Sequence, residues 1–142
     1  MLDTWYTQFG AAVIVLICGC ALWKGGWLEQ WGGGLSFIAW LASLLIQDNA
    51  ALDLQEYAML GVDFAMLAAL GVLARRGERT WPVWAAACQA ITVAVHLSKM
   101  VDFRIPTVAY ISALVLASYG VLIALAIGTF VAWREREALR PQ

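Results

Sequence analysis

Five long apolar runs, separated by short polar stretches, most constrain what this chain can fold into. The runs cover approximately residues 5–23, 28–46, 56–74, 82–103 and 106–133. A helix needs about 20 mostly apolar residues to cross the hydrocarbon core of a bilayer, and each run approaches or exceeds that length. We therefore predict an all-α fold, a polytopic membrane bundle of five transmembrane helices in one transmembrane domain over 1–142. Four spans are the alternative, if the segment 5–23 does not cross fully.

The composition supports this prediction and excludes one class of function. Hydrophobic residues make up 63% of the 142 residues, and charged residues make up only 13%. Soluble domains carry about 25% charged residues, so this surface is not built to face water. Because the chain has no basic stripe, a nucleic-acid partner is excluded. Several tryptophans lie near the ends of the apolar runs, as an interfacial aromatic belt requires: Trp5, Trp23, Trp27, Trp31, Trp81 and Trp133.

Basic residues follow the first, third and fifth runs, and this bias predicts the orientation. The acidic stretch 47–56 lies between the second and third runs. Since Lys and Arg concentrate in cytoplasmic loops, we predict the N-terminus outside and the C-terminus in the cytoplasm. The basic residues concerned are Lys24, Arg75, Arg76, Arg79, Arg134, Arg136 and Arg140.

Two ionisable residues lie well inside apolar runs. Asp63 is about eight residues from Gln55, at the outer end of the third run, which is roughly 12 Å at the helical rise per residue. His96 is about seven residues from the outer end of the fourth run, or roughly 10 Å. A short turn joins these two runs, so they are expected to be antiparallel neighbours. We therefore predict that Asp63 and His96 lie at the same depth and face each other.

A polar stripe extends this pair along the fourth run. Gln89, Thr92, His96 and Lys99 recur at positions i, i+3, i+7 and i+10 and share one helix face. Glu56 shares a face with Asp63 in the third run, and Tyr110 and Ser112 in the fifth are candidates to join. The predicted cofactor- or ligand-binding residues are His96, Asp63, Gln89, Thr92, Lys99 and Tyr110.

Three interpretations of this pocket remain open. In the first, Asp63 pairs with His96 or Lys99 and the pair only holds the two helices together. In the second, the pocket binds a cofactor. In the third, Asp63 and His96 bind and release a proton or ion during transport. As His96 is the only histidine, ligation of a haem by two histidines of one subunit is excluded. A single histidine still suffices to ligate a chlorophyll-type pigment or to hydrogen-bond a quinone carbonyl.

Catalytic and metal-binding signatures are not found in the sequence. There is no HExxH, no GxSxG, no phosphate-binding glycine loop and no CxxC. The triplet Gly32-Gly33-Gly34 predicts close packing or a helix break. Cys18, Cys20 and Cys88 all lie within apolar runs and have no metal-ligand spacing. We expect no enzyme activity and no metal site.

A row of small residues in the fifth run predicts close helix contacts. Gly120, Ala124, Gly128 and Ala132 recur every four residues, and small side chains let membrane helices approach each other. The row predicts either packing inside the bundle or a contact with another membrane subunit or a second copy.

The segment ARRGERTWPVW, followed by a polar-striped span ending in HLSKM, resembles small bacterial inner-membrane proteins of unassigned function. This resemblance implies a multi-pass protein of the bacterial inner membrane. We expect a non-catalytic subunit or accessory or assembly factor of a larger inner-membrane complex. One alternative is a small oligomeric transporter or channel, coupled to protons or ions through Asp63 and His96. The other is a quinone- or pigment-binding membrane protein.

Overall fold

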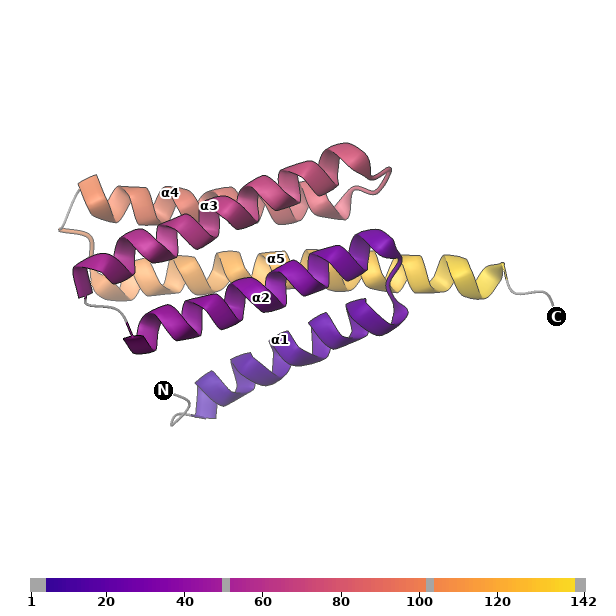
Figure 1. Ribbon diagram of the computed structural model, residues 1–142, viewed down its shortest axis with the longest axis horizontal. Helices are drawn as coiled ribbons and strands as arrows, with labels where there is room; N and C mark the ends of the chain where they lie inside the picture. Colours follow the sequence, from indigo (N-terminus) through magenta and orange to yellow (C-terminus); the bar gives the residue numbers. More distant parts are fainter. Residues whose placement is uncertain (1–4, 50–51, 102–103, 140–142) are drawn as a thin grey trace.

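Five α-helices make up the computed structural model, which describes residues 5–49, 52–101 and 104–139 and contains no strand among them. The helices are α1 (Trp5–Lys24), α2 (Trp27–Asn49), α3 (Leu52–Arg76), α4 (Trp81–Val101) and α5 (Thr107–Ala138). They lie side by side, and each reverses the direction of the one before it (Figure 1). The predicted all-α helical bundle is confirmed. Asp102 and Phe103, placed in the fourth run from the sequence, lie outside the described residues.

The most extensive helix contact is between α4 and α5, and α3 packs on α4. α1 packs on α2 and α5 and lies at the edge of the bundle (Figure 1). The core consists mainly of aliphatic and small residues, with one tryptophan: Cys18, Ala21, Leu28, Met66, Leu70, Leu73, Trp81, Ala85, Val121, Ala124 and Leu125.

Glycines on α2 and α5 allow these close contacts. A Cβ on Gly128 would overlap the indole of Trp81, and one on Gly120 would lie 2.6 Å from the Cys88 Sγ. The triplet 32–34 does not break α2; a Cβ on Gly33 would lie 2.9 Å from the Cβ of Ala21 on α1. Of the two outcomes predicted for that triplet, close packing is therefore the one observed.

The row of small residues on α5 faces the interior of the bundle. Ala124, Gly128 and Ala132 are buried, and Gly120 is partly buried. Helix α4 already occupies this face through Trp81 and Cys88. The row therefore packs within the chain. A contact with another subunit through Gly120, Ala124, Gly128 and Ala132 stays a prediction, and it would require α4 to separate from α5.

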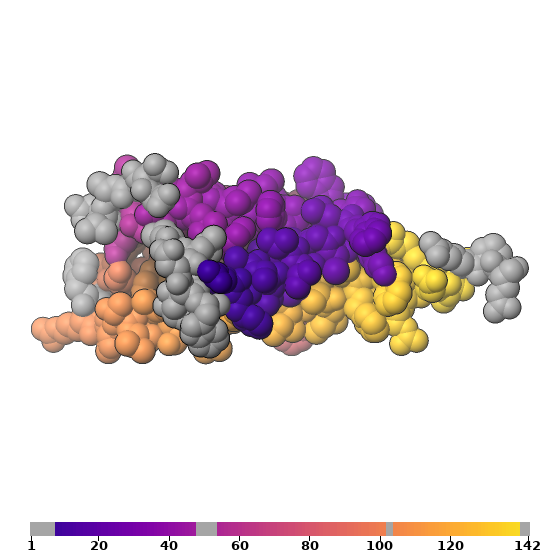
Figure 2. Space-filling model, turned by 90° about the horizontal axis from the view of Figure 1, so that it is seen from below, coloured from indigo at the N-terminus to yellow at the C-terminus, as the bar shows by residue number. Residues whose placement is uncertain are grey.

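Helix α5 continues beyond the other helices. The fifth run was placed at 106–133 from the sequence, but the helix continues from Arg134 to Ala138, whose Arg, Glu and Ala residues are good helix formers. Its 32 residues span roughly 48 Å, more than the roughly 30 Å of a bilayer's hydrocarbon core. The C-terminal turns project past the rest of the bundle (Figure 2). Arg140 lies outside the described residues.

Hydropathy gives weak support for a membrane location. Among the described residues, two helical segments are long and apolar enough to cross a bilayer, Leu54–Arg76 and Thr107–Ala138. Gln8–Lys24 is a shorter apolar helix. The coarse prediction of a helical bundle with membrane-compatible helices therefore stands, and the five-span topology is not decided by these segments.

Candidate functional site

The Asp63–His96 pair lies at the contact between α3 and α4. The Nε2 of His96 is 3.0 Å from the Oδ2 of Asp63. The Asp63 side chain is 20% exposed and the His96 side chain 10%. The predicted meeting of these two residues is confirmed, including the rotation about the helix axes that the sequence left open. Their role as binding residues stays a prediction.

Two further side chains extend the pair into a hydrogen-bonded chain. The Oη of Tyr110, on α5, is 2.7 Å from the Nδ1 of His96, and the rings meet edge to face with centroids 5.6 Å apart. On the other side, the Nε2 of Gln89 donates to the Oδ1 of Asp63 at 2.8 Å. A neutral imidazole protonated at Nε2 satisfies both contacts, because it donates to the carboxylate and accepts from the tyrosine hydroxyl.

An ion pair lies next to this chain, closer to the end of the bundle. The Nζ of Lys99 donates to the Oε1 of Glu56, and both side chains are partly exposed. The same ammonium lies 4.6 Å from the ring centroid of Tyr110, a cation–π contact. The polar path therefore runs from Gln89 in the middle of α4 to Lys99 in its last turn, as the stripe predicted.

Thr92 and Ser112 differ in their relation to the site. Thr92 is 5% exposed, and its hydroxyl donates to the backbone carbonyl of Cys88 at 3.4 Å. Ser112 is exposed and takes no part in the lining of the cavity described next. The structure thus brings all six predicted binding residues into one region, together with Glu56, and leaves Ser112 outside it.

A cavity of about 270 Å³ lies against this chain. All five helices line it, and Asp63, Gln89, Thr92 and His96 form its most polar wall. The other lining residues are mainly apolar with a few hydroxyls and one amide: Ile14, Ser36, Ala39, Trp40, Ser43, Gln47, Met59, Val62, Met66, Leu114, Ser118, Val121 and Leu122. A small, mostly apolar space with a few converging polar groups is the usual form of a ligand site.

Ligation of a pigment or haem iron by His96 conflicts with this geometry. Both ring nitrogens of His96 are within hydrogen-bonding distance of another residue, Asp63 on one side and Tyr110 on the other. A metal ligand must offer a free lone pair on one nitrogen, so ligation would break one of these contacts. No cluster of three or more His, Cys, Asp or Glu residues suits a metal ion within the described part of the chain. A quinone carbonyl needs an N–H donor, and that of neutral His96 is already directed at Asp63, so a hydrogen bond from His96 to a quinone would also break a contact. Quinone binding stays a prediction.

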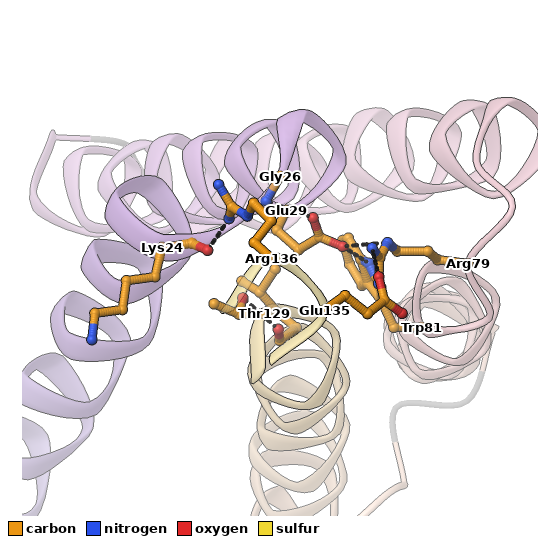
Figure 3. A network of polar contacts seen from close by, with 9 residues as sticks. Lys24, Gly26, Glu29, Arg79, Trp81, Thr129, Glu135 and Arg136 are labelled. Atoms are coloured by element: carbon orange, nitrogen blue, oxygen red, sulfur yellow. Dashed lines mark hydrogen bonds and ion pairs between the residues drawn. The ribbon is translucent and has the colours of Figure 1, made fainter. Parts of the chain in front are cut away.

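A second polar centre surrounds Glu29, and sequence reasoning missed it. Glu29 lies in the first turn of α2 and is 1% exposed (Figure 3). Its Oε2 accepts from the backbone N–H of Gly26 at 2.9 Å, and its Oε1 accepts from the Nε1 of Trp81 at 2.9 Å. The Nε of Arg79 lies 3.4 Å from the same Oε1.

Contacts to α5 complete this centre. Arg79 also pairs with Glu135, its Nη2 lying 2.5 Å from the Oε2 (Figure 3). Arg136 donates to the backbone carbonyl of Lys24 at the end of α1, and the Lys24 Nζ lies 4.5 Å from the Trp133 ring centroid. These contacts connect the α1–α2 turn and the α3–α4 turn to the C-terminal part of α5.

One local signal was available in the sequence for Glu29. The side chain of a glutamate at the third position of a helix accepts a hydrogen bond from the backbone N–H of the residue that precedes the helix. This contact is half of a capping box. Gly26 and Glu29 have this spacing. A cavity of about 370 Å³ lies beside the centre and is lined by Arg76, Arg79, Glu78 and Glu29 among others. Because two acidic and two basic side chains line it, no one ligand charge is favoured there.

Comparison with protein-family models, curated proteins and solved structures finds no match for this chain.

Proposed function

We propose that this chain is a multi-pass protein of the bacterial inner membrane whose five helices all cross the bilayer. The support is a distribution of side chains opposite to that of a soluble bundle. Large apolar side chains are exposed on every helix, for example Leu16, Ile38, Tyr57, Ile91 and Leu116. Polar side chains are buried, namely Glu29, Gln89, Thr92 and Thr129. Soluble monomers rarely expose apolar surface on this scale.

Helices α2 and α4 fit this proposal in spite of their lower hydropathy. Each carries polar side chains that point inward: Glu29 on α2, and Gln89 and Thr92 on α4, are at most 7% exposed. Such residues lower the mean hydropathy of a helix without touching lipid, and polar groups within membranes usually face the bundle interior in this way. The outward faces carry Trp31 and Ile38 on α2 and Trp84, Ile91 and Leu97 on α4.

The charges at the two ends support an orientation. The turns α1–α2 and α3–α4 and the C-terminal part of α5 lie at one end of the bundle (Figure 1). Lys24, Arg75, Arg76, Arg134 and Arg136 belong to this end, which we therefore propose to be cytoplasmic. Asp63 and His96 then lie in the outer half of the membrane.

Within this topology we propose a small proton- or ion-coupled transporter that uses Asp63 and His96. One observation carries the proposal: Asp63 and His96 line the cavity in contact with each other, and His96 also contacts Tyr110. A carboxylate and an imidazole in contact share protons readily, and ionisable groups inside membranes mark ion or proton pathways. The neighbouring Lys99–Glu56 pair continues the path toward the outer end.

The test is solute-driven proton movement in vesicles that contain the purified protein. A pH gradient is imposed, and small cationic, neutral and anionic solutes are added in turn while an internal dye reports the pH. We expect one solute class to dissipate the gradient with the wild-type protein and to have no effect with Asp63→Asn or His96→Ala. Ser98→Ala is the matched control, because Ser98 is exposed on the same helix and bonds only to Ala94 in the described contacts. If no solute dissipates the gradient, or the two variants behave like wild type, the proposal is wrong.

The accessory-subunit function is the second candidate, and the outward face of α3 favours it. Gly61, Ala65 and Ala68 are exposed there, and a Cβ on Gly61 would meet nothing within 4 Å. Small residues on an open face allow another membrane helix to pack closely. A pull-down in mild detergent tests this function: a partner lost in Gly61→Leu supports it, and a protein that purifies alone contradicts it.

A further inference from the structure

The cavity next to Asp63 carries an unbalanced charge. Asp63 and His96 are its only ionisable lining residues among those described, and no Lys or Arg lines it. Lys99 is close by, but its ammonium is paired with Glu56 and lies outside the lining. With a neutral imidazole the cavity therefore holds one negative charge, in a setting where an uncompensated charge is costly.

We infer that this cavity binds a small organic cation of the tertiary or quaternary ammonium class, in exchange for a proton at the Asp63–His96 pair. The inference rests on the proposed function and names its substrate class. An anion would meet the Asp63 carboxylate unfavourably, and a neutral ligand would leave that charge unbalanced. A monovalent cation is the class that makes the occupied cavity neutral.

The walls of the cavity suit such an ion. Trp40 on α2 contributes an indole, the aromatic group that attracts cations most strongly. Met59 and Met66 on α3 contribute polarisable and adaptable thioethers. An ammonium ion with alkyl substituents needs this combination, because its surface is apolar and its charge is diffuse.

The Asp63 carboxylate keeps room for a further contact. Among the described contacts, each of its oxygens has one side-chain partner, Gln89 at 2.8 Å and His96 at 3.0 Å. A carboxylate has about four acceptor positions, so these partners do not use all of them. The side chain is still 20% exposed and belongs to the cavity lining, so a bound cation can reach it.

Charge balance explains the exchange. When the cavity is empty and the pair carries an extra proton, ionised Asp63 and protonated His96 sum to zero. When a cation is bound, its charge, ionised Asp63 and neutral His96 again sum to zero, and the proton has left to solvent. The one bond broken is the imidazolium N–H of His96, whose electron pair stays on the nitrogen while water or buffer takes the proton. Holding both ions at once would place an extra positive charge inside the bundle, which the low dielectric disfavours.

Few other titratable groups bear on this exchange. The Glu56–Lys99 pair is neutral as a unit, and Tyr110 on α5 contacts the second ring nitrogen of His96. Helices α1 and α2 place no titratable side chain on the described lining of the cavity. The proton released on cation binding therefore comes from the Asp63–His96 pair.

The experiment compares choline with its neutral isostere 3,3-dimethyl-1-butanol, using the purified full-length protein in detergent. Calorimetry in two buffers of different ionisation enthalpy gives both the affinity and the number of protons released. We expect choline to bind at least about tenfold more tightly than the isostere, with proton release that falls as pH rises. Asp63→Asn should lose this preference, and Ser98→Ala should keep it. His96→Gln retains the carboxylate, so it should still bind choline but release no proton.

Several outcomes overturn the inference. One is equal affinity for choline and the isostere; another is binding of neither. A third is an Asp63→Asn variant that still prefers choline although its gel-filtration elution volume and circular dichroism spectrum match those of wild type. The vesicle assay separates this failure from failure of the proposed function. If only neutral or anionic solutes dissipate the pH gradient through Asp63, the transporter stands and the cation site is wrong. If choline binds but no solute moves protons, the site stands and the transporter is wrong.

Discussion

Glu29→Ala should destabilise the bundle more than any other single loss of charge at its basic end. Glu29 is 1% exposed, and its carboxylate accepts from Gly26 and Trp81 at 2.9 Å each, with Arg79 at 3.4 Å. The truncation leaves the Trp81 indole N–H without its acceptor. Trp81 is only 5% exposed, so water does not easily replace that acceptor. It also removes the bond that stabilises the start of α2.

The expected magnitude follows from these contacts. A hydrogen bond to a charged group contributes about 1.5–3 kcal/mol, and a stranded buried donor costs about 1–3 kcal/mol. Arg79 keeps Glu135 and is 31% exposed, so its lost contact adds little. The lost bond from the Gly26 N–H and the stranded Trp81 N–H therefore dominate, and together they give an expected loss of about 3–5 kcal/mol for Glu29→Ala.

The assay is reversible unfolding by SDS in mixed micelles, followed by circular dichroism. Glu135→Ala is the matched control: it removes the other carboxylate that contacts Arg79, but Glu135 is 57% exposed. We expect this control to cost less than about 1 kcal/mol. Glu29→Gln retains one acceptor and should fall between the two. A loss below about 1 kcal/mol for Glu29→Ala, or equal losses for Glu29→Ala and Glu135→Ala, would refute the reasoning.

Three further predictions concern other parts of the molecule. In the same SDS assay, Gly128→Ala should cost about 1–3 kcal/mol because its Cβ would overlap the Trp81 indole, whereas Gly61→Ala should cost nothing, since its Cβ would meet nothing within 4 Å. Lys99→Gln should change stability by less than about 1 kcal/mol, because Lys99 and Glu56 are 36% and 40% exposed; a larger loss in SDS unfolding would contradict this. A phosphatase reporter, active only outside the cytoplasm, should be inactive when fused to the C-terminus and active when fused at the α4–α5 connection; the reverse result would invert the proposed topology.

Part of the candidate site followed from the sequence because depth along a helix is a simple function of residue number. Asp63 and His96 were placed at a common depth by counting from the helix ends at a fixed rise per residue. The spacing of Gln89, Thr92, His96 and Lys99 likewise placed them on one face. What counting could not supply was the rotation of α3 against α4, which packing between the two helices decides.

Glu29 illustrates what sequence reasoning missed. In the sequence it is a charged residue that weakens the start of the second apolar run. In the structure its carboxylate meets Trp81, which is 52 positions away along the chain. For the small residues of α5, the sequence allowed either packing inside the bundle or a contact with another subunit. In the structure they pack inside the bundle, against Trp81 and Cys88.

The sequence by itself determined five helices of near-membrane length, the basic end and the axial position of the polar residues, because these depend on local composition and helix geometry. Only the tertiary structure decided which side chains meet: Tyr110 with His96, Gln89 with Asp63 and Trp81 with Glu29. It also left a cavity where the five helices meet beside Asp63. Such contacts depend on how each helix is turned and how closely its neighbours approach, and these are properties of the packed bundle rather than of any one segment.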